Sequence, residues 1–353
     1  MWTLQPENVR ALSIQLISVL HHRVDNLNNL KTHIEAAIRH AKSVKPLQYF
    51  IEYMHTFVTS LVPEKKADIV MPLHRDIMDN PQAQRVRLVS DLINRKARKK
   101  SGLFLVEGPQ AVREAVRYAA DSVRDIYVRN DYATSEVLRA VVRESIDKNL
   151  YVHQATDKVM HAISSDCQGI AAVVHMEAVV RSADEFQTDA GSLSAACWQL
   201  RDPGNAGTII RAADASGCQA VVLVGDCVDI TNPKVVRSTA GSLFHIPVFY
   251  AREEEFFEVM RAQSACITAA EIYGTDSTPV VPLQQALTHT DKRQANVILF
   301  GNEARGLPAE IVDQCDRAAI IPLYGKAESL NVAMSASVML YSFAMHMRDT
   351  PTE

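Results

Sequence analysis

Residues 320–347 read IIPLYGKAESLNVAMSASVMLYSFAMHM, and the rest of the chain is organised around this stretch. A short apolar run ends at Pro322, a polar loop follows, and a long segment without Gly or Pro completes it, which predicts strand, loop and helix. Ser329 stands at the expected N-cap, and Asn331 falls inside the first helical turn. The loop and the start of the helix are therefore expected to form a polar pocket.

The first turns of this predicted helix carry small side chains at Ala333, Ser335, Ala336 and Ser337. Small residues allow another backbone to approach closely, as a binding site or a tightly packed helix would require. A buried C-terminal helix, with its serines bonded to carbonyls one turn earlier, explains the pattern equally well. Other segments must decide between the two interpretations.

Composition restricts the class of protein. The 353 residues suffice for two or three modules, and the net charge of −4 argues against a uniformly basic nucleic-acid-binding surface. The six cysteines are dispersed and form no CxxC pair, which is typical of reduced thiols in a cytoplasmic protein. No metal-ligand spacing, bilayer-length apolar run or signal peptide is present, so we expect no metal site and no membrane segment.

Helical spacing in the first part of the chain predicts an N-terminal helical extension over residues 1–78, with residues 63–81 as a linker. A natural start at Met71 is an alternative. Strand and helix patterns then alternate over residues 79–178, which predicts a small α/β domain. A polar, turn-rich boundary follows, and residues 190–349 predict a second α/β domain with a mostly parallel sheet.

A basic segment opens the first α/β domain. RVRLVSDLINRKARKK, residues 85–100, carries seven basic residues and one acidic residue, and we interpret it as a cationic helix. An ordinary solvated face is the alternative, but the dense run at its end favours contact with phosphates. That run consists of Arg95, Lys96, Arg98, Lys99 and Lys100.

Three polar loops follow predicted strands of the second domain, at residues 201–211, 301–308 and 324–331. Ligands of open α/β sheets bind at the carboxyl ends of the strands, so these loops should share one edge. In the first loop Gly207 is expected to open a helix N-terminus suited to anions, with Arg211 one turn further on. Each loop alone is also compatible with an ordinary turn.

In this order the loops resemble the SpoU, or TrmH, family of the SPOUT class of RNA methyltransferases. The three family motifs match RDPGNAGTIIRAADASG, LFGNEARGLP and IIPLYGKAESLNVAMSASVML. Upstream, SGLFLVEGPQAVREAV and QGIAAVV look like the family's small RNA substrate-binding domain. The resemblance covers about residues 85–347, and its departures, such as Asp202 where Asn is frequent, remove no polar catalytic position.

The resemblance implies a C-terminal trefoil-knotted parallel-sheet SPOUT domain, a homodimer, and S-adenosylmethionine bound at the knot. It implies transfer of the donor's methyl group to a ribose 2′-hydroxyl of RNA, most plausibly 23S ribosomal RNA. Transfer RNA is an alternative substrate, and a catalytically silent rRNA-binding protein of the same fold is an alternative function. No GxGxxG turn of a Rossmann-type enzyme occurs.

The family's functional positions carry over as follows. The catalytic positions are Arg211, Asn205, Glu303, Asn331 and Ser329; the cofactor positions are Leu299, Gly301, Ile321 and Leu330; Arg237 is a further RNA contact. Because guanidinium groups do not deprotonate in proteins, we assign Arg211 to orientation and charge stabilisation, not to proton removal. We assign Glu303 to orienting Arg211 or Asn205, and Asn331 to holding the ribose or the cofactor.

Overall fold

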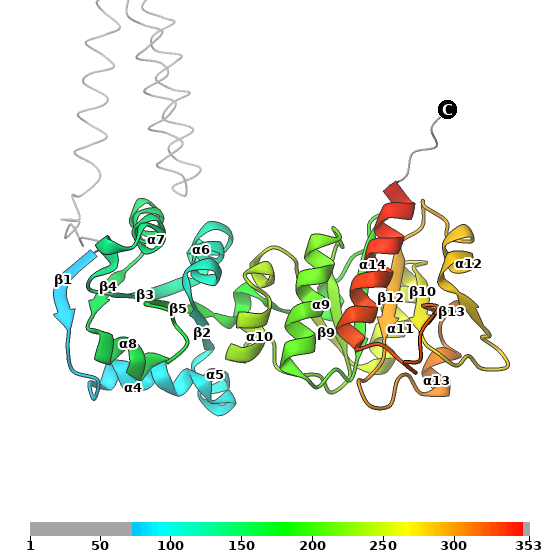
Figure 1. Ribbon diagram of the computed structural model, residues 1–353, viewed down its shortest axis with the longest axis horizontal. Helices are drawn as coiled ribbons and strands as arrows, with labels where there is room; N and C mark the ends of the chain where they lie inside the picture. Colours follow the sequence, from blue (N-terminus) through cyan, green and yellow to red (C-terminus); the bar gives the residue numbers. More distant parts are fainter. Residues whose placement is uncertain (1–72, 349–353) are drawn as a thin grey trace, which may run out of the picture. The chain divides into compact units, whose positions relative to one another are not determined.

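The computed structural model describes residues 73–348, and the predicted N-terminal helices and Met71 lie outside them. The described residues carry two α/β domains, each built on one sheet (Figure 1). Among these residues, no helix combines the length and apolar character that crossing a bilayer requires. The same part of the chain contains no group of three or more His, Cys, Asp or Glu side chains that could hold a metal ion.

The first domain is a five-stranded sheet in the order β1-β4-β3-β5-β2. Its strands are β1 (Leu73–Met78), β2 (Leu103–Glu107), β3 (Val123–Arg129), β4 (Val152–Ala155) and β5 (Ile170–His175). β5 runs antiparallel to β2 and β3, whereas β4 is parallel to β1 and β3. β1 lies inside the predicted linker, so the linker expectation for this segment is wrong.

Five helices cover the two faces of this sheet: α4 (Gln84–Ser90), α5 (Arg95–Ser101), α6 (Pro109–Tyr118), α7 (Glu136–Asp147) and α8 (Asp157–Ile163). α6 and α7 pack on one face and α4 and α8 on the other (Figure 1). The prediction of one continuous cationic helix over residues 85–100 is wrong, because Asn94 is extended, with ψ of 128°. The 3-10 turn Asp91–Ile93 and Asn94 therefore separate α4 from α5.

The second domain is an eight-stranded sheet in the order β11-β13-β10-β12-β7-β8-β9-β6. Its strands are β6 (Val180–Ser182), β7 (Leu193–Trp198), β8 (Val221–Val224), β9 (Val248–Ala251), β10 (Cys266–Ala270), β11 (Val280–Pro282), β12 (Asn296–Phe300) and β13 (Arg317–Ile320). All of its pairings are parallel, which confirms the predicted sheet type. β6 comes from the predicted boundary segment and pairs with β9 at the edge of the sheet.

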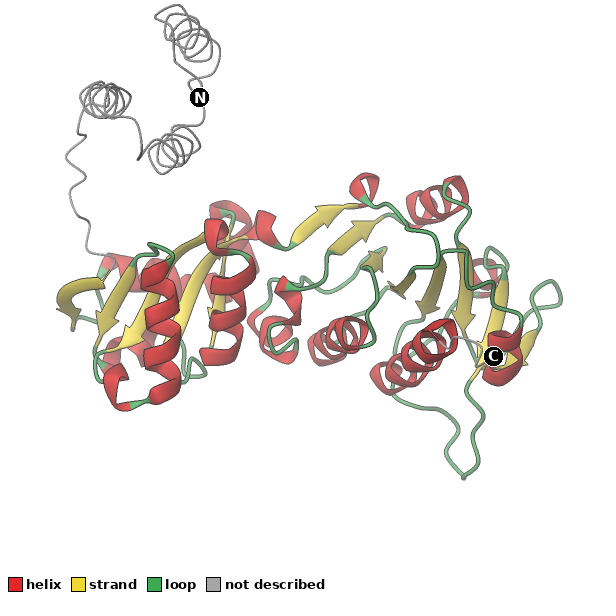
Figure 2. Cartoon of the chain, turned by 90° about the horizontal axis from the view of Figure 1, so that it is seen from above, coloured by secondary structure: helices red, strands yellow, loops and turns green. Residues whose placement is uncertain are grey.

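Helices lie on both sides of the second sheet (Figure 2). They are α9 (Pro203–Ala215), α10 (Pro233–Ser238), α11 (Glu253–Ala262), α12 (Leu283–Thr288), α13 (Ala309–Val312) and α14 (Val332–Arg348). Apolar side chains of α9, α10, α12 and α14 form one core with one face of the sheet, and those of α11 and α13 form another with the opposite face. Both faces are thus buried, as a parallel sheet requires.

The two domains meet where β2 of the first lies against α10 of the second and where α6 of the first lies against the 3-10 turn Ser242–Phe244 of the second. Polar pairs join them: Arg237 pairs with the buried Glu107, and His245 Nε2 lies 3.2 Å from Glu114 Oε2. His245 Nδ1 also lies 2.9 Å from Asp214 Oδ2, so this imidazole bridges carboxylates of both domains. The described residues therefore hold the two sheets together by specific polar contacts as well as by apolar packing.

Candidate functional site

A pocket of about 350 Å³ lies where three neighbouring strands of the second sheet end. β13, β10 and β12 are adjacent and parallel, so their carboxyl ends meet at one edge of the sheet. The pocket is lined by residues 270–273, 300–306, 319–321 and 323 and by Ser329, Leu330, Val332, Ser335 and Met339. The polar loops predicted at residues 301–308 and 324–331 thus meet at the edge expected of a ligand site.

Two glycines shape the loop after β12. A Cβ added to Gly301 would come within 2.4 Å of the carbonyl carbon of Gly306, so only glycine permits this backbone approach. Gly306 has φ of +66°, and the backbones of Asn302 and Gly306 exchange two hydrogen bonds of 3.1 and 2.9 Å. The loop that carries Glu303 is therefore a closed, tight turn at the pocket.

Side chains of all three polar loops form a connected chain. Asn331 Nδ2 donates to Asn205 Oδ1 at 3.1 Å, and Asn205 Nδ2 donates to Glu303 Oε1 at 3.4 Å. We call Asn331, Asn205 and Glu303 the amide relay. Its two hydrogen-bonded pairs are 98 and 126 residues apart in sequence, and only the folded sheet edge brings them together.

Glu303 holds the start of α9 in place. Its Oε1 accepts from the backbone amide of Asp202 at 2.9 Å, and the amide of Arg201 also points to this carboxylate, at 3.3 Å. Hydrogen bonds to a carboxylate are stronger than those between neutral groups. Glu303 therefore orients the first polar loop through its backbone and through Asn205.

The helix after β7 begins earlier than the sequence pattern predicts. Asp202 is the N-cap, its Oδ1 accepts from the amide of Asn205 at 2.8 Å, and Pro203 occupies the first turn. Gly207 consequently lies within α9 rather than at an anion-binding terminus, which corrects that expectation. A Cβ on Gly207 would lie 2.4 Å from Ser238 Cβ and 2.7 Å from the Val235 carbonyl oxygen, so glycine is needed where α9 meets α10.

Asn331, not Ser329, caps α14. Its Oδ1 accepts from the amides of Ala333 at 2.9 Å and Met334 at 3.4 Å, and the helix begins at Val332. The N-cap prediction for Ser329 is therefore wrong, although Ser329 does line the pocket. The serine lies on the exposed loop before the helix, where its hydroxyl is accessible to a ligand.

Arg211 lies on α9 with an exposed side chain. Among the described residues its guanidinium has no hydrogen-bond or ion-pair partner, so the structure does not link it to Glu303 as we considered from the sequence. A cation without an internal partner on the helix that carries Asn205 is available for an anionic ligand.

Comparison with known proteins identifies the family. The model of the SpoU rRNA Methylase family matches residues 192–341, and that of the MRM3-like substrate binding domain matches residues 83–172. The 23S rRNA (guanosine(2553)-2′-O)-methyltransferase RlmP of Bacillus subtilis is 30% identical over 268 residues, which cover 75% of this chain and 97% of that protein. The chain belongs to the SpoU rRNA methylase family.

Other proteins of the SpoU family are also similar to this chain. The 23S rRNA (uridine(2479)-2′-O)-methyltransferase of Streptomyces viridochromogenes is 30% identical over 70% of this chain and 84% of its own length. The AdoMet-bound rRNA methyltransferase from Sinorhizobium meliloti superposes with a TM-score of 0.66 at 26% identity, covering 79% of this chain and all of that one. The family resemblance drawn from the three motifs is thereby confirmed.

Three of the four cofactor positions predicted for this SpoU chain line the pocket: Gly301, Ile321 and Leu330. Leu299 is not among the residues that line it, and its side chain is fully buried in the core that the sheet forms with α11 and α13; the family resemblance assigns this position to a backbone contact. Sequence analysis missed the lining segment Glu271, Ile272 and Tyr273. These residues directly follow β10, and the rule that ligands bind at strand ends could have identified them.

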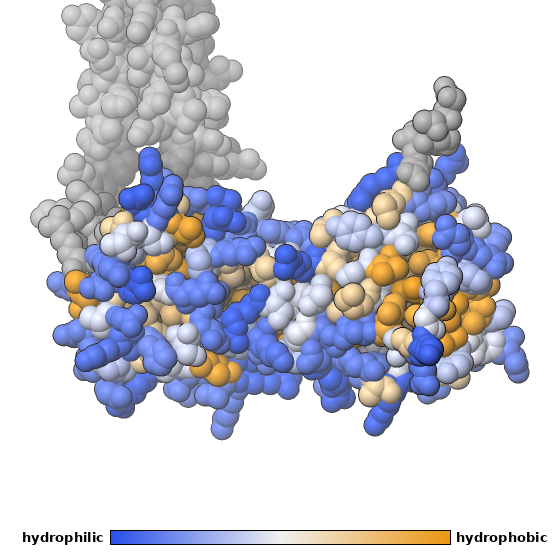
Figure 3. Space-filling model, viewed as in Figure 1, coloured by the Kyte–Doolittle hydropathy of each residue, from blue (hydrophilic) through white to orange (hydrophobic). Residues whose placement is uncertain are grey.

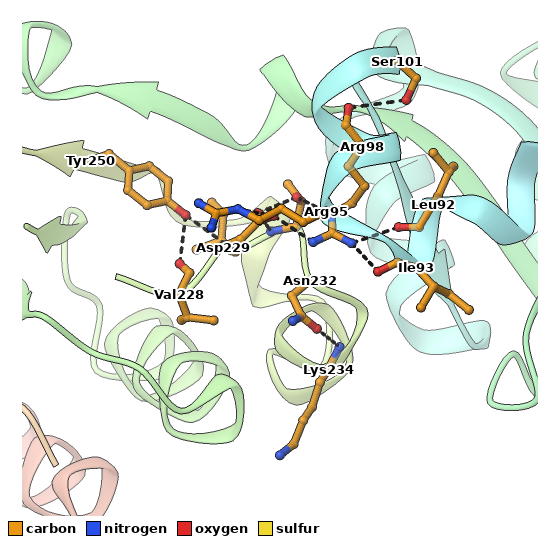
Figure 4. Close-up of polar contacts among 12 residues, drawn as sticks. Leu92, Ile93, Arg95, Arg98, Ser101, Val228, Asp229, Asn232, Lys234 and Tyr250 are labelled. Carbon is orange, nitrogen blue, oxygen red and sulfur yellow. Dashed lines mark hydrogen bonds and ion pairs between the residues drawn. The ribbon is translucent and has the colours of Figure 1, made fainter. Parts of the chain in front are cut away.

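The predicted RNA contacts of the SpoU chain divide into two groups. Arg95, Lys96, Lys99 and Lys100 are exposed on or at the start of α5. Arg98 is only 2% exposed and donates to Thr231 Oγ1 and Asp229 Oδ2 of the other domain (Figure 4), so its assignment to RNA binding is corrected.

Arg237 also differs from the expectation. Its guanidinium pairs with Glu107 and with Asp166 of the first domain, the latter at 3.1 Å. With both pairs formed, Arg237 joins the domains rather than presenting a free cation to RNA. On α5, by contrast, the exposed basic residues are Arg95, Lys96, Lys99 and Lys100, so lysines carry most of the exposed positive charge of that helix.

Proposed function

We propose that this protein transfers the methyl group of S-adenosylmethionine to a ribose 2′-hydroxyl of RNA and that its substrate is 23S ribosomal RNA. The observation that carries the proposal is the amide relay, which links the three SpoU motifs beside the pocket at the ends of β10, β12 and β13. The substrate class is supported by the Bacillus and Streptomyces relatives, both named as 23S rRNA 2′-O-methyltransferases.

The pocket has the chemistry to hold this cofactor. Ile321, Leu323 and Leu330 provide apolar surface suited to an adenine ring, and Ser329 and the Glu271 carboxylate provide polar groups at the same pocket. Glu271 is itself fixed, since its Oε2 accepts from the amide of Leu307 at 3.0 Å. When bound, S-adenosylmethionine supplies an electrophilic methyl group on a sulfonium. A structure of a SpoU relative with this cofactor bound supports the assignment.

Each polar residue then has a defined task. Arg211 binds the phosphate and hydroxyl of the target nucleotide through its guanidinium donors and positions them. The amide relay fixes Asn205, Glu303 holds the loop from Arg201 to Asn205, and Asn331 and Ser329 face the ribose or the cofactor end. Such positioning can supply roughly 7–11 kcal/mol of a barrier in well-oriented systems.

We further infer a homodimer formed through α14. Met334, Val338, Tyr341 and Met345 recur along one side of this helix and are 40–59% exposed. Apolar side chains gather on this part of the surface (Figure 3). A contiguous exposed apolar surface marks an interaction site. A second copy of the chain would cover it, as the family resemblance implies.

The trefoil knot, the cytoplasmic location and the division into domains also belong to this proposal. The strand order, with β12 between β7 and β10 and with α14 packed against α9 and β7, is compatible with a trefoil knot. All six cysteines are free thiols, which supports a cytoplasmic location. The division into an RNA substrate-binding domain and a catalytic domain is part of the proposal too, but their sheets begin at β1 (Leu73) and β6 (Val180) instead of at the predicted residues 79 and 190.

Methyl transfer from labelled S-adenosylmethionine to deproteinised 23S rRNA tests the function directly. We expect label in the RNA, resistance of the modified position to alkaline cleavage, and one modified nucleotide on mapping. Label in transfer RNA instead would redirect the substrate assignment. Binding of 23S rRNA without any transfer would favour a catalytically silent rRNA-binding protein and would contradict the proposal.

A further inference from the structure

A second pocket of about 350 Å³ lies at the junction of the two domains. Ile93 and Arg95 line it from the first domain, and Arg201, Asp229 and Asn232 line it from the second. We call it the junction pocket. Its volume lies at the small end of the range of ligand-binding pockets, and it contains apolar as well as polar groups, as such pockets do.

The floor of the junction pocket is built from buried, fully bonded groups (Figure 4). Arg98 Nη2 donates to Asp229 Oδ2 at 2.8 Å and its Nε donates to Thr231 Oγ1 at 3.1 Å, while Nη1 donates to the carbonyls of Leu92 and Ile93. Burial alone would raise the pKa of Asp229, but hydrogen bonds from Thr231 and Arg98 outweigh it and lower the pKa. This floor is therefore preformed and electrically neutralised.

The segment that forms one wall is equally fixed. Tyr250 Oη donates to the carbonyl of Val228 at 3.2 Å and accepts from the amide of Ile230 at 2.9 Å (Figure 4). Asn232 Oδ1 accepts from the amide of Lys234 at 2.9 Å, which caps α10 and fixes the orientation of the Asn232 amide. A pocket whose walls are held in this way binds a ligand without a large ordering cost.

The rim, in contrast, carries cations whose partners are weak. Arg201 Nη2 pairs with Asp226 Oδ2 at 2.9 Å, but both side chains are more than half exposed. Arg95 Nε lies 4.0 Å from Asp229 Oδ2 and is also mostly exposed. Exposed ion pairs of this kind contribute little, so an incoming phosphate can replace them. Arginine in particular binds phosphate with two parallel hydrogen bonds.

Arg201 connects the junction pocket to the catalytic edge. Its side chain lines the pocket, whereas its backbone amide donates to Glu303 of the amide relay. Arg95, which lines the pocket from the first domain, lies on α5 together with the exposed Lys96, Lys99 and Lys100. An RNA strand that contacts both α5 and the catalytic edge therefore passes the junction pocket.

We propose that the junction pocket binds one unpaired nucleotide of the RNA substrate, flanking the methylated one, with its phosphate on Arg95 and Arg201 and its base against Ile93. The proposal rests on the proposed function and specifies how the substrate is held. Ile93 is 53% exposed, which leaves an apolar surface available for a base. Proteins that recognise RNA sequence bind unstacked bases of single strands on apolar, aromatic or guanidinium surfaces.

The test uses the full-length protein and two probes: a short mixed-sequence single-stranded RNA and the same RNA annealed to its complement. Arg201→Ala should weaken single-strand binding about tenfold, as loss of a hydrogen bond to a charged group does, and should lower the salt slope by roughly 0.7. Ile93→Ala should weaken single-strand binding without changing the slope. Duplex binding should change much less in both variants.

Arg139→Ala is the matched control, because Arg139 is an exposed arginine of α7, on the sheet face opposite α4 and α8. Thermal unfolding and calorimetric binding of S-adenosylmethionine should be unchanged in all three variants. Two results would overturn the pocket assignment in a protein that still transfers methyl groups. In the first, Arg201→Ala and Ile93→Ala lose equal affinity for the single strand and for the duplex. In the second, both variants bind the single strand as tightly as Arg139→Ala does. Absence of transfer and of RNA binding by the unmodified protein would instead overturn the proposed function.

Discussion

Two groups of polar side chains in this molecule differ in how much of their hydrogen-bonding capacity is used by contacts within the protein. At the domain junction Arg98 is 2% exposed and donates four hydrogen bonds to protein acceptors. At the catalytic edge Arg211 on α9 and two members of the amide relay, Glu303 and Asn331, are exposed. A saturated cation holds protein parts together, whereas an unsaturated one is available to a ligand. Charge alone does not distinguish the two.

Replacement of Arg98 by Met tests the junction side of this comparison. The free energy of unfolding should fall by about 3–5 kcal/mol, because removal of one partner leaves the mostly buried Asp229 carboxylate uncompensated. Denaturant unfolding measures the change. Arg95→Met, which removes an exposed cation from the same helix, should alter stability by no more than about 0.5 kcal/mol. Equal losses of stability in Arg98→Met and Arg95→Met would contradict the difference between a buried, fully bonded arginine and an exposed one.

Replacement of Arg211 by Ala tests the catalytic side. The rate of methyl transfer should fall by about 100- to 1000-fold, the range seen when one preorganised donor to a reacting group is removed. Labelled transfer to 23S rRNA measures the rate. Calorimetry should show almost unchanged affinity for S-adenosylmethionine and denaturation almost unchanged stability, since this guanidinium has no partner among residues 73–348. Parallel loss of cofactor affinity would contradict the role given to Arg211.

Gly207→Ala extends the comparison to the packing of α9 against α10. Alanine would gain about 1 kcal/mol of helix propensity, but its Cβ would meet Ser238 Cβ at 2.4 Å and force α9 from α10. Overpacking of this kind costs about 1–3 kcal/mol, so a net loss of stability is expected in denaturant unfolding. Gly325→Ala is the control, because a Cβ there meets nothing within 4 Å. A stabilised Gly207→Ala variant would show that the helices separate freely.

The smallest expected effect is a pH dependence of the junction. Because the pKa of Asp229 is lowered in the folded protein, its stabilisation is complete above the ordinary value of 3.8 and is lost as the pH falls through the folded pKa. The difference in unfolding free energy between the unmodified protein and Asp229→Asn should therefore shrink over the acidic interval that begins near pH 3.8 and extends down through the lower pKa of the folded protein. A difference that stays constant over this interval would contradict a charged Asp229 at the junction.

Sequence reasoning was most successful where the signal was local and strong. Apolar runs such as NVILF and AVVLVG predict strands that the structure contains as β12 and β8. The short strands β1, β6 and β11 are missed; β6 and β11, at three residues each, are too short for a periodic pattern. Pairing with a neighbouring strand, which the sequence does not reveal, determines them.

In the candidate site, too, local sequence patterns were predictive and long-range contacts could not be foreseen. The three motifs place Asn205, Glu303 and Asn331 correctly at one edge, and the structure adds which atoms meet. The basic run predicts exposed cations but not that Arg98 is buried, since a break at Asn94 changes the helix face on which each residue lies. Burial across a domain junction depends on residues more than 130 positions away, and no local pattern contains them.

The amide relay has a defined polarity. Asn331 must turn its oxygen to the first amides of α14, so its nitrogen faces Asn205; the oxygen of Asn205 is thereby used, and its nitrogen faces the Glu303 carboxylate. Donor follows acceptor in one direction only, and rotating either amide by half a turn would set like against like. The cap of α14 thus determines, through the one intervening amide of Asn205, that an amide nitrogen and not an oxygen points to the Glu303 carboxylate.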